Sequence, residues 1–124
     1  MIRIGLTGGV ASGKSTALTL FKSFGCAVFS SDDIVHKLFE KKLISEFDYS
    51  VVITAGLDIR VERFLNSSLA GRNQNDFFEI SRNQMNDSKR TALADFVIKN
   101  NGSKEDLKFA IKNVLETIKK QKGF

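Results

Sequence analysis

Short apolar runs alternate along this chain with longer stretches in which apolar residues recur every three or four positions. The short runs predict β-strands, and the longer stretches predict amphipathic helices. The strands are expected at 2–7, 26–29, 49–55 and 94–98. The helices are expected at 13–24, 33–47, 58–69 and 75–85, with a last helix after the turn at 100–102. Because strands and helices alternate, the pattern predicts an α/β fold with a mainly parallel sheet and helices on both of its faces.

Turn and cap residues support two of these helix boundaries. Gly25 follows the first expected helix and suits its carboxyl-terminal cap. Ser103 and Asp106 have the spacing of a capping box before the last helix. The polar segment 67–74 contains a glycine and predicts a loop, which with the following helix forms a short lid around 66–86.

A glycine-rich loop, GGVASGKST at residues 8–16, joins the first expected strand to the first expected helix. It fits the pattern G-x-x-x-x-G-K-[ST], and strand, loop and helix in this order are the context in which the pattern binds phosphates. A turn that merely joins a strand to a helix would not need all of these fixed positions. The loop residues are Gly8, Gly9, Val10, Ala11, Ser12, Gly13, Lys14, Ser15 and Thr16.

Each residue type in this loop has a chemical use. The glycines let successive backbone N–H groups turn inward, so that they form a concave site for anions. Lys14 can neutralise the outer phosphates of a nucleotide, and the Ser15 hydroxyl can ligate Mg²⁺. We therefore expect the loop to bind ATP together with Mg²⁺.

Composition and charge narrow the class of protein. The 124 residues are 42% hydrophobic and 27% charged, and the single cysteine, Cys26, excludes an internal disulfide. No apolar run approaches the length of a membrane span, so we expect a cytoplasmic protein without a membrane partner. The net charge of +5 could indicate nucleic acid. Because no basic stretch is interleaved with aromatic residues, we expect a solvated lysine-rich face and no nucleic-acid partner.

Several segments beyond the loop resemble the dephospho-coenzyme A kinase family. Residues 4–16 match the opening of that family, including the Thr-Gly-Gly that generic phosphate loops lack. Residues 28–36 resemble its D-A-D-x-I-A-H segment, and further matches follow at 38–53 and 84–103. The resemblance implies a P-loop nucleoside-kinase-like fold. It also implies transfer of the γ-phosphate of ATP to the ribose 3′-hydroxyl of dephospho-coenzyme A, the last step of coenzyme A biosynthesis.

The chain departs from the family pattern at one place above all. Only Lys37 separates His36 from Leu38, where family members carry several helices and a further strand. We interpret this as an internal deletion that removes one central strand and most of the acceptor-binding domain. A single domain, 1–124, is then expected, with a nucleotide-loop part at 1–36 and a C-terminal part at 38–124. Either the remaining strands pair directly with strand 2–7, or the core stays partly open.

Two single residues also depart from the family pattern. Ser30 replaces the first aspartate of the D-A-D-x-I-A-H segment, and Ile80 stands where the family has an arginine, four residues before Gln84.

The resemblance assigns roles to residues outside the loop. Asp32 follows the second strand. The polar segment in which it lies, residues 30–33, by itself suits the N-cap of a helix. The resemblance instead makes Asp32 the catalytic carboxylate, which acts together with Lys14. Arg63 and Arg82 are candidates for neutralising phosphate charge, with exposed helical arginines as the alternative. Asn100 and Gly102 resemble the family's adenine-side turn.

Three functions stay open at this point. The first is an ATP- and Mg²⁺-dependent dephospho-coenzyme A kinase whose activity is reduced or lost through the deletion, with dephospho-coenzyme A as its acceptor. The second is a catalytically inactive remnant that only binds ATP. The third, a basic nucleic-acid-binding domain, has the least support.

Overall fold

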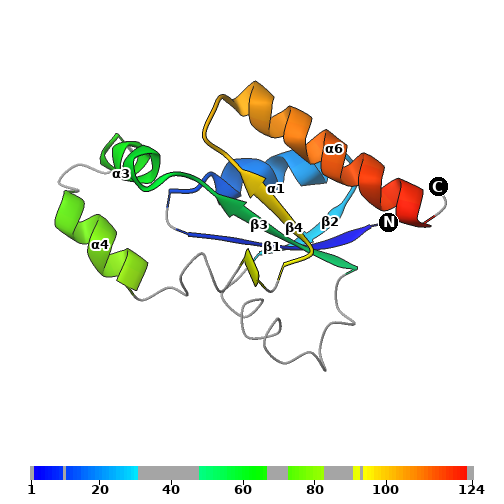
Figure 1. Cartoon of the computed structure of the whole chain (residues 1–124), viewed down its shortest axis with the longest axis horizontal. Helices are drawn as coiled ribbons and strands as arrows, with labels where there is room; N and C mark the ends of the chain where they lie inside the picture. Colours follow the sequence, from blue (N-terminus) through cyan, green and yellow to red (C-terminus); the bar gives the residue numbers. More distant parts are fainter. Residues whose placement is uncertain are drawn as a thin grey trace.

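A computed structural model describes residues 2–9, 11–30, 48–66, 73–82, 91–92 and 94–122. The elements within these residues are β1 (Arg3–Gly8), α1 (Lys14–Ser23), β2 (Ala27–Phe29), β3 (Tyr49–Thr54), α3 (Leu57–Leu65), α4 (Gln74–Arg82), β4 (Phe96–Lys99) and α6 (Lys104–Lys122) (Figure 1). The four strands form one sheet in which every neighbouring pair is parallel. This confirms the α/β fold and the parallel sheet. The helix predicted at 33–47 lies outside the described residues.

Strand β1 has a hydrogen-bonded neighbour on each side, because the strand order is β2-β1-β3-β4. On one side Ile4 lies opposite Val28 of β2, and on the other side Leu6 lies opposite Val51 of β3. Of the two outcomes expected from the deletion, the structure has the first: the described strands pair directly with one another, and β1 has no open side. This arrangement gives the backbone N–H and C=O groups of β1 the partners that a buried strand requires.

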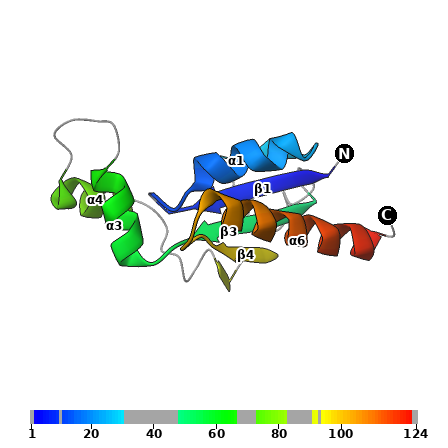
Figure 2. The ribbon, with the colours of Figure 1, turned by 90° about the horizontal axis from the view of Figure 1, so that it is seen from above.

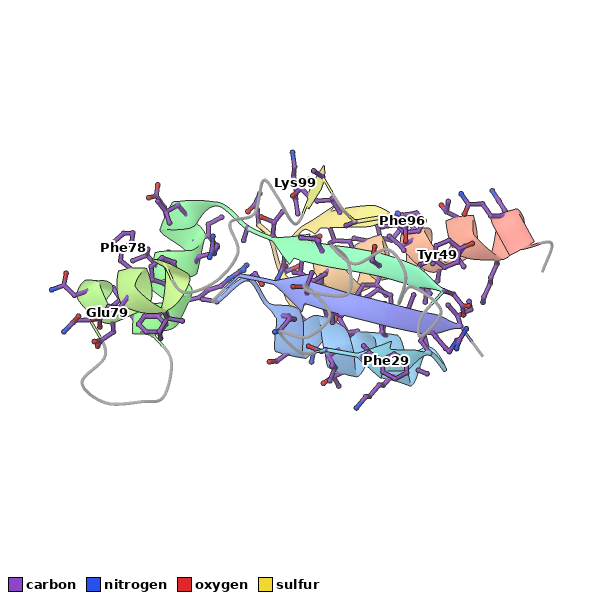
Figure 3. All side chains as sticks on the ribbon, turned by 90° about the horizontal axis from the view of Figure 1, so that it is seen from below. Phe29, Tyr49, Phe78, Glu79, Phe96 and Lys99 are labelled. Atoms are coloured by element: carbon purple, nitrogen blue, oxygen red, sulfur yellow. The ribbon has the colours of Figure 1, made fainter. Side chains whose placement is uncertain are left out.

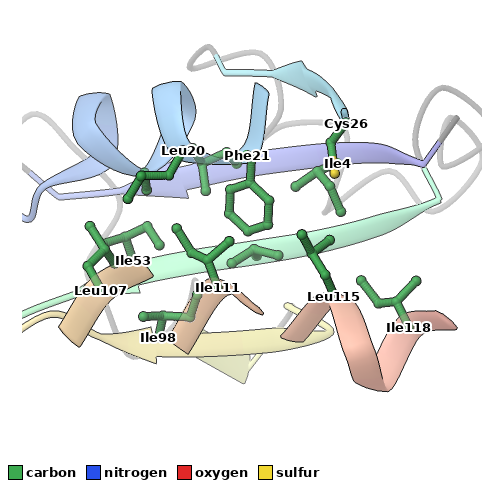
Figure 4. Packing of buried hydrophobic residues seen from close by; sticks show 13 residues of the cluster. Ile4, Leu20, Phe21, Cys26, Ile53, Ile98, Leu107, Ile111, Leu115 and Ile118 are labelled. Atoms are coloured by element: carbon green, nitrogen blue, oxygen red, sulfur yellow. The ribbon is translucent and has the colours of Figure 1, made fainter. Parts of the chain in front are cut away.

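Helices α1 and α6 both pack on the same face of the sheet. Side chains from both helices converge on β1 and β3, with Phe21 of α1 and Ile111 of α6 fully buried (Figure 4). The members of this core are Ile4, Leu6, Ala17, Leu20, Phe21, Cys26, Val51, Ile53, Ile98, Leu107, Ile111, Leu115 and Ile118. The rings of Tyr49 and Phe96 extend the core at the starts of β3 and β4, with centroids 5.8 Å apart (Figure 3). Each large side chain buried in this way stabilises the fold by about 1.5–3 kcal/mol.

The other face of the sheet is buried at its two central strands, whereas Phe29 of β2 and Val97 of β4 are exposed on it. Thr7, Ser50 and Val52 alternate with core residues along β1 and β3, and their side chains are at most 4% exposed. A helix on this second face remains a prediction, and the helix expected at 33–47 lies outside the described residues.

Both predicted helix boundaries are confirmed, with one shift of position. Phe24 is the cap residue of α1, and Gly25 follows it in the left-handed conformation at φ +88°. The N–H groups of Gly25 and Cys26 donate to the carbonyls of Lys22 and Phe21, which is the Schellman arrangement.

The capping box before α6 forms in both directions. The backbone N–H of Ser103 donates to Asp106 Oδ2, and the N–H of Asp106 donates to Ser103 Oγ, each at 3.1 Å.

Among the described helices, none is both long enough and apolar enough to cross a membrane.

Helices α3 and α4 lie together beyond the carboxyl ends of the strands, away from the end where α6 finishes (Figures 1 and 2). Phe64 of α3 and Phe77 of α4 make an edge-to-face contact with ring centroids 5.6 Å apart. The guanidinium carbon of Arg60 lies 5.5 Å from the centre of the Phe77 ring, as in a cation–π contact. The observed bounds of α4 fall inside the predicted lid segment.

Candidate functional site

The glycine-rich loop occupies the turn between the carboxyl end of β1 and the amino end of α1. Among its described residues, Ala11 and Gly13 have positive φ angles, at +59° and +97°. The N–H of Ser12 closes the turn by donating to the carbonyl of Gly9 at 3.2 Å. This backbone is the strand–loop–helix geometry that the sequence predicts for residues 8–16.

Close packing explains two of the loop glycines. A Cβ on Gly8 would lie 2.6 Å from the carbonyl oxygen of Ile53 and 2.6 Å from Ser12 Oγ. A Cβ on Gly13 would overlap the side-chain amide nitrogen of Asn100, and the positive φ of Gly13 disfavours any side chain. Neither position accepts a larger residue without a shift of its neighbours.

The carbonyl of Ser12 holds the loop against two distant parts of the chain. It accepts a hydrogen bond from Asn100 Nδ2 at 2.9 Å and one from Arg63 Nη1 at 3.4 Å. Arg63 also donates through Nη2 to the carbonyl of Asn100 at 2.8 Å. The loop, α3 and the turn after β4 are therefore tied together at one point.

The loop encloses a cavity of about 310 Å³. The residues that line it are Gly8, Gly9, Ala11, Ser12, Gly13, Lys14, Ser15, Thr16 and, from α4, Ile80. Every predicted loop residue that the structure describes thus faces one cavity, and Val10 lies outside the described residues.

The electrostatics of the cavity suit an anion. Helix α1 begins here without an acidic residue in its first turn, and no side chain of the described residues caps its N–H groups. Such a helix end carries partial positive charge, to which the half-buried Lys14 adds a full one.

One buried polar atom beside the cavity has no partner. Ser12 is 1% exposed, and its Oγ makes no hydrogen bond within the described part of the chain. A buried hydroxyl left in this state costs about 1–3 kcal/mol, and a ligand or water in the cavity would remove that cost.

The other predicted site residues have different positions. Arg63 and Asn100 reach the loop, as described above, through hydrogen bonds to backbone carbonyls. Gly102 lies beside the capping box, where a Cβ would contact Asp106. Asp32 and the side chain of Arg82 fall outside the described residues, so their predicted roles stay predictions.

Ile80 also lines the cavity, although the sequence analysis names it only as a departure, at the position where the resembled family has an arginine. Its spacing of three residues from the buried Phe77 places the two on neighbouring positions of one side of α4. The helical period could have indicated this, but only the packing of α4 shows that this side reaches the loop.

Comparison with known proteins identifies relatives for much of the chain. The family model described as dephospho-CoA kinase matches residues 35–106. A dephospho-CoA kinase of Bartonella quintana is 56% identical over 41 residues, which are 33% of this chain and 21% of that protein. A dephospho-CoA kinase of Coxiella burnetii is 40% identical over 62 residues, 45% of this chain and 31% of that protein. The matches therefore span less than a third of either relative.

Solved structures share the fold at low sequence identity. The crystal structure of TT1252 from Thermus thermophilus superimposes with a TM-score of 0.70 and 20% identity, covering 94% of this chain and 97% of that one. An uncharacterized protein from Eubacterium ventriosum gives a TM-score of 0.67 at 10% identity, covering 94% of this chain and 99% of that one.

Proposed function

Because the chain belongs to the dephospho-CoA kinase family, we propose that the cavity at residues 8–16 binds the phosphates of ATP together with Mg²⁺. The observation that carries this proposal is the cavity itself. Described loop residues line it, and Lys14 and the amino end of α1 face it. Among the described residues, nothing caps that helix end and nothing bonds the buried hydroxyl of Ser12. A simple connecting turn requires none of these features.

The loop residues have separate tasks in this proposal. Backbone N–H groups and Lys14 hold the outer phosphates and neutralise their charge. The exposed Ser15 hydroxyl, on the cavity wall, is the ligand that the chain offers to Mg²⁺. When bound, the ion supplies charge neutralisation to the phosphates. Arg63 and Asn100 hold the loop in place by donating hydrogen bonds to the carbonyl of Ser12.

We further propose that transfer to the ribose 3′-hydroxyl of dephospho-coenzyme A is very slow or absent in this chain alone. The short matches to full relatives and the direct β2–β1 pairing support the loss of a central strand and of the acceptor-binding region beside it. Correct orientation of two reactants lowers a barrier by about 7–11 kcal/mol, and this contribution depends on an acceptor site. Slow hydrolysis of ATP by water is the residual activity we expect.

Calorimetric titration with ATP and Mg²⁺ tests the binding proposal. We expect Lys14→Ala to weaken binding by about 10- to 100-fold, because charged hydrogen bonds contribute about 1.5–3 kcal/mol. Lys22→Ala is the matched control, since Lys22 is exposed in the last turn of the same helix. A folded chain that releases no heat with millimolar nucleotide would refute the proposal.

A coupled assay with dephospho-coenzyme A as acceptor tests the second proposal. Asp32→Ala serves as the control, because the family resemblance makes Asp32 the catalytic carboxylate. Turnover near the roughly 1–100 s⁻¹ usual for kinases, abolished by this substitution, would show that the chain still builds an acceptor site. Hydrolysis of ATP without an acceptor product is the expected result.

A further inference from the structure

Residues of α3 and α4 line a groove of about 500 Å³ at the end of the molecule that these two helices form, where Figure 3 labels Phe78. Apolar side chains in its lining are open to solvent, since Leu57 is 53% exposed, Leu65 38% and Phe78 43%. Val61 lies between Leu57 and Leu65 at a spacing of four residues, so these three form one line along α3. An exposed apolar surface of this kind, here named the α3–α4 groove, is typical of a site that binds another molecule.

The α3–α4 groove is separate from the phosphate cavity. On α3, Val61 lies two positions before Arg63, whose guanidinium donates to a carbonyl of the glycine-rich loop. On α4, Phe78 lies two positions before Ile80, which lines the phosphate cavity. Residues two positions apart on an α-helix project to nearly opposite sides. The groove therefore lies on the sides of both helices that face away from the loop, and a partner bound there leaves the phosphate cavity open.

Two exposed carboxylates border the apolar line of the groove. Asp58 and Glu62 both belong to its lining, and they lie four positions apart, one turn from each other on the same side of α3. Like charges at this spacing repel each other, and two positive charges one turn apart would relieve that repulsion. The groove therefore suits a partner that presents an apolar side chain beside a pair of cations.

Helix α6 of the same chain presents this combination on its surface. Phe109 is 67% exposed, more than any other large apolar side chain among the described residues that are exposed. Lys108 and Lys112 are exposed beside it, four positions apart like the two carboxylates. Glu105 and Glu116 lie beyond them at either end, so the positive surface is confined to the two turns around the ring. Lys108, Phe109 and Lys112 are named here the α6 ridge.

We infer that the α3–α4 groove of one copy of this chain binds the α6 ridge of a second copy. The ring of Phe109 enters the apolar line of the groove, and the two lysines of the ridge meet the two carboxylates at its border. The buried ring supplies most of the affinity, and the paired charges determine which surfaces meet. A second copy is the occupant because every chain carries both complementary surfaces. A contact this small belongs to the weak interfaces, so we expect a Kd of about 10–100 µM.

Sedimentation velocity of the whole chain between about 5 and 500 µM measures this association. We expect the average mass to rise with concentration in the unmodified chain. Phe109→Ala should weaken the association by about tenfold or more, since an aromatic side chain in a pocket dominates such a contact. Val97→Ala is the control, because Val97 is 38% exposed on β4 and belongs to neither surface, and it should leave the Kd within about twofold. Circular dichroism checks the folding of each variant.

A pair of charge-reversed chains tests the pairing itself. One variant combines Asp58→Lys with Glu62→Lys in the groove, and the other combines Lys108→Glu with Lys112→Glu in the ridge. Each variant alone should stay monomeric, because like charges then meet in its groove–ridge contact. An equimolar mixture should associate, because each groove again meets a ridge of opposite charge.

Three results would overturn this inference. The first is an unmodified chain that stays monomeric at about 500 µM, which would leave the groove to a different partner. The second is a Phe109→Ala chain that associates as strongly as Val97→Ala does, a comparison that decides the matter even if a charge-reversed variant fails to fold. The third is a mixture of the two folded charge-reversed chains that stays monomeric. None of these results bears on nucleotide binding, because the groove lies away from the phosphate cavity.

Discussion

Replacing Gly13 with alanine should destabilise the chain by more than backbone strain alone. Gly13 has a φ of +97° where α1 begins, and a Cβ there would overlap the amide nitrogen of Asn100. That nitrogen donates the buried 2.9 Å hydrogen bond to the carbonyl of Ser12. Gly25 provides a comparison, because its φ is +88° but, apart from its chain neighbours, no described residue has an atom within 4 Å of the position of its Cβ.

Both substitutions put a Cβ on a left-handed backbone, and Gly13→Ala adds the overlap with Asn100, so the cost of that overlap can be estimated from their difference. A left-handed backbone costs a residue with a Cβ roughly 1–2 kcal/mol, and both variants incur this cost. Moving the Asn100 amide would also break its hydrogen bond and leave buried polar atoms unsatisfied, at about 1–3 kcal/mol. We therefore expect Gly25→Ala to lower the free energy of unfolding by about 1–2 kcal/mol and Gly13→Ala by about 2–5 kcal/mol.

Urea unfolding with linear extrapolation measures both values. An Asn100→Ala background tests the cause. Without the amide the extra cost should disappear, so that the total cost of Gly13→Ala falls to that of Gly25→Ala. Equal costs for the two glycines, within about 0.5 kcal/mol in the unmodified background, would refute the reasoning.

Three further outcomes follow from the core, the caps and the one cysteine. Ile111→Ala should lower the free energy of unfolding in urea by about 2–5 kcal/mol, since Ile111 is fully buried. Phe109→Ala on the same helix should change it by less than about 0.5 kcal/mol, because Phe109 is 67% exposed. Ser103→Ala should cost about 1 kcal/mol through loss of the capping box, and unfolding that matches the unmodified chain would contradict this. Burial raises the pKa of the Cys26 thiol. The unfolded chain therefore releases this proton at a lower pH than the folded chain does. Above about pH 8.5 the free energy of unfolding should fall with pH more steeply in the unmodified chain than in Cys26→Ala. Urea titrations at several pH values measure this difference.

Local patterns determined the elements and several of their boundaries. The loop at residues 8–16, the left-handed Gly25 and the Ser103–Asp106 box all depend on residues a few positions apart, so the sequence alone predicts them. The buried face of α6 follows from its helical period in the same way. Each of these features is a property of one element and its immediate neighbours.

Only the tertiary structure decided how distant elements meet at the site. The hydrogen bond from Asn100 to the carbonyl of Ser12 joins residues 88 positions apart, and that from Arg63 spans 51. The place of Ile80 depends on the packing of two helices through Phe77. No local pattern encodes such contacts, because they depend on the relative positions of whole elements on the sheet. The direct pairing of β2 with β1 is another such contact. It is made by backbone groups that every strand has, so the residues of a strand do not indicate which strand will be its neighbour.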